Sequence, residues 1–136
     1  MSNFSKQKGK RGEKDFTAEL QSLLGKIKER KKAAGHTAWE YGPQAFVDVQ
    51  ANGSDIQSIE GLAIEVKRQE VLNVSAWWKQ AERQADNLGA IPVLAYRQNR
   101  KTWSVCLPGY LLGLGISGYL VIDMKTFEDW LYVYLN

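Results

Sequence analysis

Hydrophobic residues recur at intervals of three and four near the start of the chain, the period of one face of an α-helix. That face would carry Phe16, Leu20, Leu23, Leu24 and Ile27. The pattern predicts an amphipathic helix from Gly12 to about Ala34, with Gly35 as its C-cap. Residues 1–10 are polar and basic instead, which predicts a flexible arm ahead of the helix.

Short apolar runs between turn-forming residues predict strands in the next part of the chain. The alternating run AFVDV (45–49) and the run DIQSI (55–59) predict two strands, joined by a turn at NGSD. The run LAIEVK (62–67) follows at once and predicts a third strand. We expect these three strands to form an antiparallel meander.

The second half of the chain predicts two further helices and three further strands. Ser75 and Gly89 are expected to cap the two ends of one helix, over residues 75–88. The apolar run IPVLAYR (91–97) is typical of a buried strand. The remaining elements are strands within 102–108 and 118–124 and a final helix capped by Thr126. The order helix, three strands, helix and strands predicts an α/β fold, with a central mixed β-sheet flanked by helices.

Length and composition fit one globular domain. The chain has 136 residues, of which 44% are hydrophobic and 24% charged, and we assign 11–136 to a single domain. No apolar run approaches the roughly 20 residues that span a bilayer. The basic N-terminus has no apolar stretch behind it, so it does not resemble a secretory signal, and the single cysteine excludes an internal disulfide. We therefore expect an intracellular, cytoplasmic protein.

The positive charge is concentrated at the start of the chain. Residues 1–32 carry ten Lys or Arg against four acids, whereas the whole chain has a net charge of only +3. Such a basic segment favours a polyanionic partner, because each neutralised phosphate releases counterions. A solubilising tail and an exposed helix face would give the same pattern, so charge alone leaves both interpretations open.

Two opposite charges interrupt the apolar run at 62–67. Glu65 and Lys67 are two residues apart, so on a strand they share one face. Buried charges are costly unless they are paired or arranged around an ion. Asp55 lies at the mouth of the preceding predicted strand and would come near this face. Two carboxylates and a lysine suit a hard divalent cation such as Mg²⁺, whereas a surface ion pair is the plainer alternative.

These motifs resemble a known family. GSDI followed by IEVK is similar to the PD-(D/E)xK nuclease superfamily, with Ser54 where the superfamily has a proline. The opening KGKRGEKDF resembles the start of archaeal-type and phage Holliday junction resolvases. The resemblance covers roughly residues 8–105. It implies a restriction-endonuclease-like core of order αβββαβ and a metal-dependent endodeoxyribonuclease that leaves 5′-phosphate ends.

The resemblance also implies roles for particular residues. Glu13, Asp55 and Glu65 would bind Mg²⁺ or Mn²⁺, with the Val66 carbonyl as a further ligand, and Lys67 would orient the attacking water. The DNA would be a branched four-way junction, cut by a homodimer of two-fold symmetry during recombination or repair, in a phage-encoded enzyme. Candidate nucleic-acid-binding residues are Lys8, Lys10, Arg11, Lys14, Arg68, Lys79, Gln80 and Arg83.

Several alternatives remain open from the sequence. Other nucleases of the superfamily cut flaps, nicks, single strands or specific duplex sites, and a non-catalytic nucleic-acid-binding module would keep the fold and the basic segment. Asp48, Glu60 and Glu70 are rival acids. The only histidine, His36, is expected on a surface loop, and Cys106 is expected to be a small buried residue. The other residues singled out are Trp77 and Trp78, for which core positions are the plainer expectation.

Overall fold

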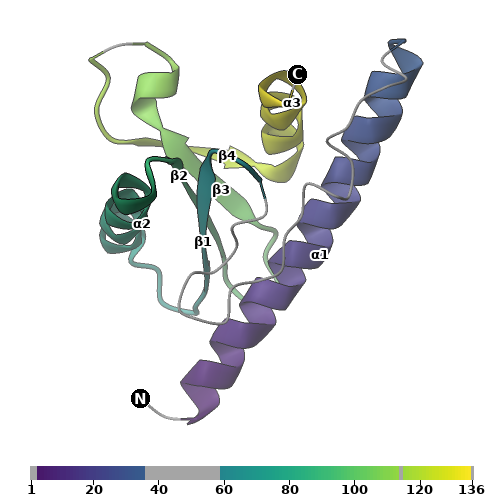
Figure 1. Ribbon diagram of the computed structural model, residues 1–136. Helices are drawn as coiled ribbons and strands as arrows, with labels where there is room; N and C mark the ends of the chain where they lie inside the picture. The colour runs from purple at the N-terminus through teal and green to yellow at the C-terminus, as the bar shows by residue number, and fades with distance from the viewer. Residues whose placement is uncertain (1–2, 36–58, 114, 136) are drawn as a thin grey trace.

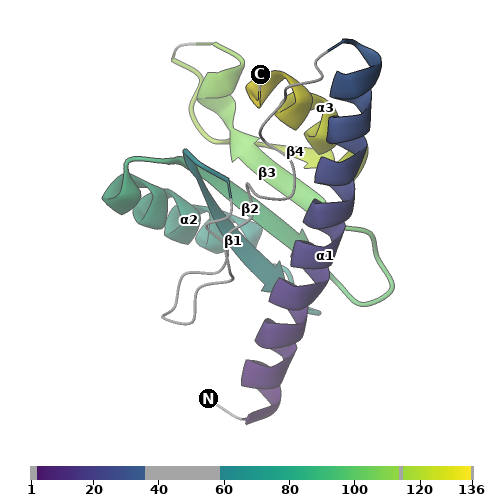
Figure 2. The same cartoon turned by 45° about the vertical axis from the view of Figure 1, so that its right-hand side comes forward.

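Three helices flank a four-stranded sheet in the computed structural model, which describes residues 3–35, 59–113 and 115–135. Figures 1 and 2 show α2 on one side of the sheet, and α1 with α3 on the other. The elements in chain order are α1 (Asn3–Ala33), β1 (Leu62–Arg68), α2 (Val74–Leu88), β2 (Ile91–Arg97), β3 (Ser104–Pro108), the 3₁₀ turn η2 (Gly109–Leu111), β4 (Tyr119–Asp123) and α3 (Met124–Tyr134).

The sheet is mixed, as the sequence predicts. Its strand order is β1-β2-β3-β4. β1 and β2 run parallel and are joined by the crossover helix α2, because parallel neighbours need a long connection. β3 is antiparallel to both β2 and β4. β1 is therefore the terminal strand on one side of the described sheet.

The larger hydrophobic core lies between the sheet and the pair α1 and α3. It contains the apolar face predicted for the first helix and the alternate residues of the strands, among them Leu62, Ile64, Val66, Val93, Ala95, Val105 and Leu107. Phe16 of α1 packs edge-on against Trp103, with ring centroids 5.1 Å apart. A smaller cluster on the opposite face joins Trp78 and Ala81 of α2 to Leu94 and Cys106. These two clusters fix which face of each strand points to which helix.

Charged groups join the end of α1 to α3. Arg30 donates to Glu128 at 2.7 Å and to Asp129 at 3.0 Å, and Lys125 lies 3.2 Å from both carboxylates. The guanidinium of Arg30 also lies 4.3 Å from the centre of the Tyr132 ring. Because Glu128 is buried, this pairing is what makes its burial tolerable.

Most predicted elements are confirmed, with shifted ends. α1 begins at Asn3, so the backbone of residues 3–10 is helical, whereas the sequence predicted a flexible arm. α2 begins at Val74, with Asn73 in the N-cap position, whereas the sequence predicted Ser75 as the cap. Gly89 does end α2, in the left-handed conformation (φ 64°) that favours glycine. The cap of α3 is Asp123, not Thr126, because the Asp123 carboxylate accepts from the Thr126 backbone N–H at 2.7 Å.

Some predicted features lie outside the described residues. They are the strand expected over 45–49, the strand over 55–59 apart from Ile59, and the antiparallel meander that both would form with β1. His36, Asp48, Ser54 and Asp55 also lie outside. In the described part of the chain, no helix combines the length and the apolar character needed to cross a membrane.

Candidate active site

Glu65 and Lys67 form a close pair on β1. Lys67 Nζ lies 3.4 Å from Glu65 Oε1. Glu65 is only 3% exposed, whereas the side chain of Lys67 is 23% exposed. The carboxylate is thus buried, whereas the lysine side chain is partly exposed to solvent.

Strand alternation places this pair on the α2-facing side of the sheet. Val66 and its alternate neighbours point into the larger core under α1, so Glu65 and Lys67 point the other way. The register aligns Glu65 with Leu94 and Lys67 with Tyr96 on β2. A buried carboxylate beside apolar residues costs stability, so a position of this kind is characteristic of a functional site.

One flank of α2 faces the same region. Trp77 packs near Tyr96, with ring centroids 6.1 Å apart, while the next residue, Trp78, packs against Tyr119 on the far strand β4. Gln80 is half-buried and lies about 60° from Trp77 around the helix axis, so it shares the flank near β1.

The predicted lysine on α2 lies elsewhere. Lys79 is exposed and lies about 160° from Trp77 around the helix, and Arg83 is likewise exposed. Of the two α2 residues expected to face the active site, only Gln80 is therefore on the appropriate flank.

α1 approaches β1 very closely at Gly12. This residue is buried, and a Cβ atom placed on it would lie 2.9 Å from Arg68 Cβ. Observed Cβ contacts are essentially never that short, so only glycine allows the helix to lie this near the end of β1. The next residue along α1 is Glu13, whose position therefore depends on this contact.

An ion-pair network fixes the same turn of α1. Arg68 donates to Asp15 at 2.7 Å and to Asn99 at 3.2 Å, and Arg97 lies 3.8 Å from the same Asp15 oxygen. Arg68, expected to bind nucleic acid, thus ties α1 to β1 and to the β2–β3 turn. Any contact of Arg68 with DNA remains a prediction.

The contacts of Asp15 limit the direction in which the Glu13 side chain can point. Residues two apart on a helix point about 200° apart, so Glu13 and Asp15 lie on nearly opposite sides of α1. Because Asp15 points toward Arg68 and Arg97, the half-buried Glu13 points away from these two arginines. Glu13 approaches from the α1 side and Glu65 lies on the α2 side, so the two carboxylates can meet only around the edge of β1.

The described rival acids have structural roles. Glu70 receives the backbone N–H of Asn99 on its Oε1 at 2.9 Å, which joins the β1–α2 loop to the β2–β3 turn. Glu60 is exposed just before β1 begins, at the opposite end of the strand from Lys67, and its carbonyl accepts from the Tyr134 hydroxyl at 2.7 Å. Glu60 precedes β1 and Glu70 follows its last residue by two positions, so neither acid lies on the strand that carries Glu65 and Lys67.

The donor chemistry suits a hard divalent cation, but the described residues supply only part of a site. Carboxylate oxygens are the ligands that Mg²⁺ and Mn²⁺ prefer. Among the described residues, no three His, Cys, Asp or Glu side chains are grouped closely enough to hold a metal ion. Asp55, the remaining predicted ligand, lies outside them. Glu65 is thus the best-placed described ligand, and the complete set remains a prediction.

Burial affects two titratable groups on the α2-facing side. It raises the pKa of the Tyr96 hydroxyl, the nearby Cys106 acts in the same direction, and a hydrogen bond with Ser104 opposes the rise. Burial also raises the pKa of the Cys106 thiol to about 12. Cys106 is therefore a neutral, buried thiol, which agrees with the prediction for it and excludes a thiolate nucleophile there.

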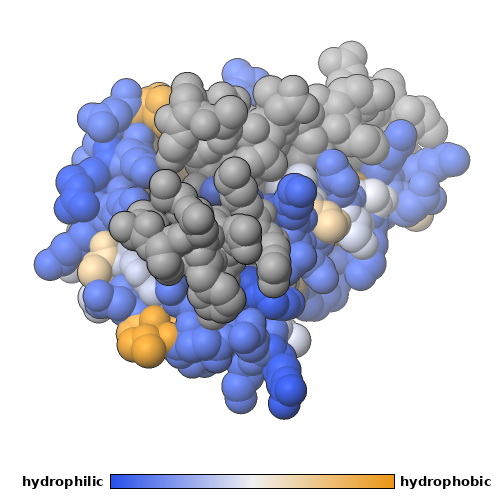
Figure 3. Space-filling view, turned by 90° about the horizontal axis from the view of Figure 1, so that it is seen from below, coloured by the Kyte–Doolittle hydropathy of each residue, from blue (hydrophilic) through white to orange (hydrophobic). Residues whose placement is uncertain are grey.

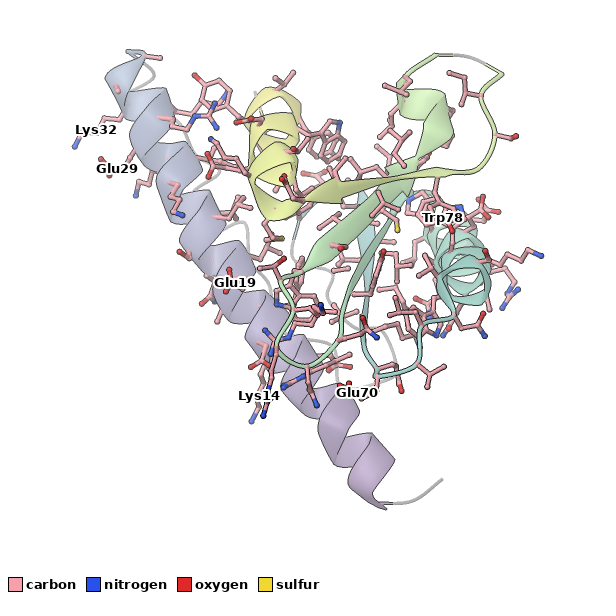
Figure 4. The ribbon with its side chains drawn as sticks, turned by 180° about the vertical axis from the view of Figure 1, so that it is seen from behind. Lys14, Glu19, Glu29, Lys32, Glu70 and Trp78 are labelled. Carbon is pink, nitrogen blue, oxygen red and sulfur yellow. The ribbon has the colours of Figure 1, made fainter. Side chains whose placement is uncertain are left out.

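Basic groups gather near the start of α1. Figure 4 shows Lys14 at the same end of the molecule as Glu70, with Glu19, Glu29 and Lys32 progressively farther along α1. Lys14 is exposed. Lys8, Lys10 and Arg11 belong to the first turns of α1, and their side chains are outside the described part.

Taken with this geometry, the α/β fold and a buried Glu-x-Lys pair on a strand define a nuclease of the PD-(D/E)xK class. Residues 4–115 match the family described as "Phage putative PDDEXK endonuclease", and the chain belongs to this family. Its three helices and mixed sheet are consistent with a restriction-endonuclease-like core. β4 and α3 lie beyond the matched residues. The curated proteins and the solved structures offer no match.

Three structural features around the site escaped the sequence analysis. The Asp15–Arg68 contact joins residues 53 apart in the chain, and no local pattern signals it. The contact at Gly12 did have a signal, since an isolated glycine in a helical pattern often marks close packing. Tyr96 lies in the continuous apolar run of β2, in which the sequence does not distinguish the two faces of the strand.

Proposed function

We propose that the protein is a Mg²⁺-dependent DNA endonuclease that cuts four-way junctions and leaves 5′-phosphate ends. The observation that carries the proposal is the Glu65–Lys67 pair, in which a buried carboxylate lies 3.4 Å from the ammonium group of a partly exposed lysine on the same strand. Nucleases of this superfamily generally use divalent metals. A bound Mg²⁺ or Mn²⁺ would stabilise the negative charge that develops on the phosphate and lower the pKa of a bound water.

The residues of this chain would have distinct tasks. Glu65, Asp55 and Glu13 would hold the cation at the outer edge of β1, together with the Val66 carbonyl. Lys67 would orient the attacking water and offset negative charge on the phosphate, for which a partly exposed lysine side chain beside Glu65 is well suited. Gln80, on the flank of α2 near β1, would position the DNA backbone.

Branched DNA is the substrate that we favour. The basic start of α1 provides a sequence-independent way to bind phosphates, which suits an enzyme that recognises the shape of its DNA rather than its base sequence. A homodimer would place two sites on the symmetric strands of a junction. Such an enzyme would act in the host cytoplasm during recombination or repair of phage DNA.

The test compares substrates and metals directly. Purified protein is incubated with a labelled four-way junction, the matched linear duplex and the single strand, each with Mg²⁺, with Mn²⁺ or with EDTA. Symmetric paired cuts in the junction alone, abolished by EDTA, are expected. Cutting of the duplex or single strand instead would support a nuclease but reject the four-way junction as its substrate. Metal-independent binding without any cutting would show that the protein is a non-catalytic binding module.

The basic segment has its own test. Removal of residues 1–10 should weaken DNA binding and flatten the dependence of the binding constant on salt, since several lysines there would release counterions. An unchanged dependence of the binding constant on salt would indicate that this segment serves solubility rather than DNA binding.

A further inference from the structure

Two adjacent apolar side chains are exposed just beyond the candidate active site. Val71 is 82% exposed and Leu72 is 42% exposed, in the loop that connects β1 to α2. They follow Lys67 by four and five residues. Single exposed apolar residues are ordinary on protein surfaces, but two neighbours on one loop beside a candidate site call for an explanation.

The loop is held firmly in place. The Gln69 backbone N–H donates to the Arg97 carbonyl at 3.2 Å, and Gln98 Nε2 donates to the Glu70 carbonyl at 2.6 Å. The Asn99 backbone N–H donates to the Glu70 carboxylate at 2.9 Å. These bonds tie the residues just before Val71 to the β2–β3 turn, which restrains the loop where it leaves β1.

The surroundings of the loop favour an anionic partner. Arg100 and Lys101 are exposed on the β2–β3 turn to which the loop is bonded, and Lys14 lies at the same end of the molecule (Figure 4). Of the nearby acids, Asp15 is paired with Arg68, and Glu70, directly before Val71, accepts from the Asn99 backbone N–H. Figure 3 views the molecule from the end where α1 begins, and the coloured part of that surface is mostly hydrophilic, with small separate hydrophobic patches.

We propose that Val71 and Leu72 form an apolar wedge that inserts between bases of the bound DNA beside the scissile phosphate. DNA suits this surface because its phosphates complement the cations around the loop, while its base stack accepts apolar side chains when a step is opened. The proposal rests on the proposed nuclease function and adds how that site deforms its substrate. Because the preceding residues are bonded to the β2–β3 turn, less binding energy is lost in ordering this loop.

The experiment compares Val71→Ser with Val133→Ser. Val133 is 71% exposed on α3, away from this end of the molecule, and serves as a matched control (Figure 1). Unstacking is followed by 2-aminopurine fluorescence in junction and duplex substrates, with cleavage blocked by Lys67→Met. Cleavage is measured separately in the otherwise wild-type protein, with intact DNA and with DNA carrying an unpaired bulge at the cut site.

The wedge predicts a rise in fluorescence on binding that Val71→Ser loses and Val133→Ser keeps. It also predicts that Val71→Ser lowers kcat/KM on intact DNA by about fivefold, the value of partly burying one valine side chain, and that the bulge restores most of this loss. Equal behaviour of the two variants would overturn the wedge. So would a loss caused by a change in oligomeric state, detected by sedimentation, which would make the loop a protein contact.

The same data separate the wedge from the nuclease. Protein that unstacks DNA without ever cutting it would support the wedge and reject the proposed function. Protein that cuts without any unstacking would support the proposed function and reject the wedge.

Discussion

Replacing Gly12 with alanine tests how closely α1 must approach β1. The added methyl group would lie 2.9 Å from Arg68 Cβ, an atom attached directly to the backbone of β1, so the helix or the strand must move. Gly25, on the same helix, is the matched control, because a methyl group there would meet no atom of the described residues within 4 Å.

The expected magnitude follows from two opposing effects. Glycine to alanine inside a helix stabilises by about 1 kcal/mol at either position, because alanine loses less backbone entropy on folding. At Gly12 the overpacking costs about 1–3 kcal/mol. The difference in unfolding free energy between Gly25→Ala and Gly12→Ala therefore measures the clash, and we expect Gly25→Ala to be the more stable by about 1–3 kcal/mol.

Urea unfolding, followed by circular dichroism and tryptophan fluorescence, gives both free energies. The cleavage rate at low denaturant should also fall for Gly12→Ala alone, because the shift displaces the neighbouring Glu13. Equal stability gains in both variants would show that α1 has room at Gly12 and would refute the argument that glycine is required there.

Three other predictions concern stability and reactivity. Arg30→Ala should lower the unfolding free energy by about 1–2 kcal/mol, since buried Glu128 loses its closest partner, whereas exchange of the exposed Lys125 for alanine should cost less in the same urea titration. Asp123→Ala should lower the thermal midpoint at neutral pH. Backbone hydrogen bonding lowers the pKa of Asp123 in the folded protein, so its contribution to stability is complete above the ordinary aspartate pKa and disappears as the pH falls through the lowered pKa. The melting curves of wild type and variant should therefore converge in acid, and a constant gap between them would contradict this. Because burial raises the pKa of Cys106 to about 12, the thiol should react with a chromogenic disulfide at pH 8 only after unfolding, and rapid labelling of the folded protein would contradict its burial.

Local patterns predicted most of the described fold. The period of three and four around Phe16 and Leu20 located the buried face of α1, and the apolar run of β2 located a buried strand. Helix ends were less predictable because caps depend on one hydrogen bond: Thr126 supplies the backbone donor at the start of α3, and Asp123 supplies the acceptor. The helical start at Asn3 went unpredicted because residues 3–10 show no apolar periodicity.

The candidate site was predictable only in part. Strand alternation was enough to pair Glu65 with Lys67, since both lie on one strand. The sequence could not reveal that Glu13 and Glu65 approach from opposite faces, because that depends on how α1 lies across the sheet. The support of α1 by Arg68 and Asp15 is likewise a tertiary contact between distant parts of the chain.

The most direct test of the account is the effect of Lys67→Met on cleavage and on binding. Lys32→Met is the control, because Lys32 is exposed near the far end of α1 from Lys14 (Figure 4). Junction cleavage with Mg²⁺ and junction binding by gel shift are measured for wild type and both variants. The account predicts that Lys67→Met abolishes cleavage while binding stays close to that of wild type, and that Lys32→Met still cuts. Undiminished cleavage by Lys67→Met would contradict the account and leave Glu65 and Lys67 as a structural ion pair.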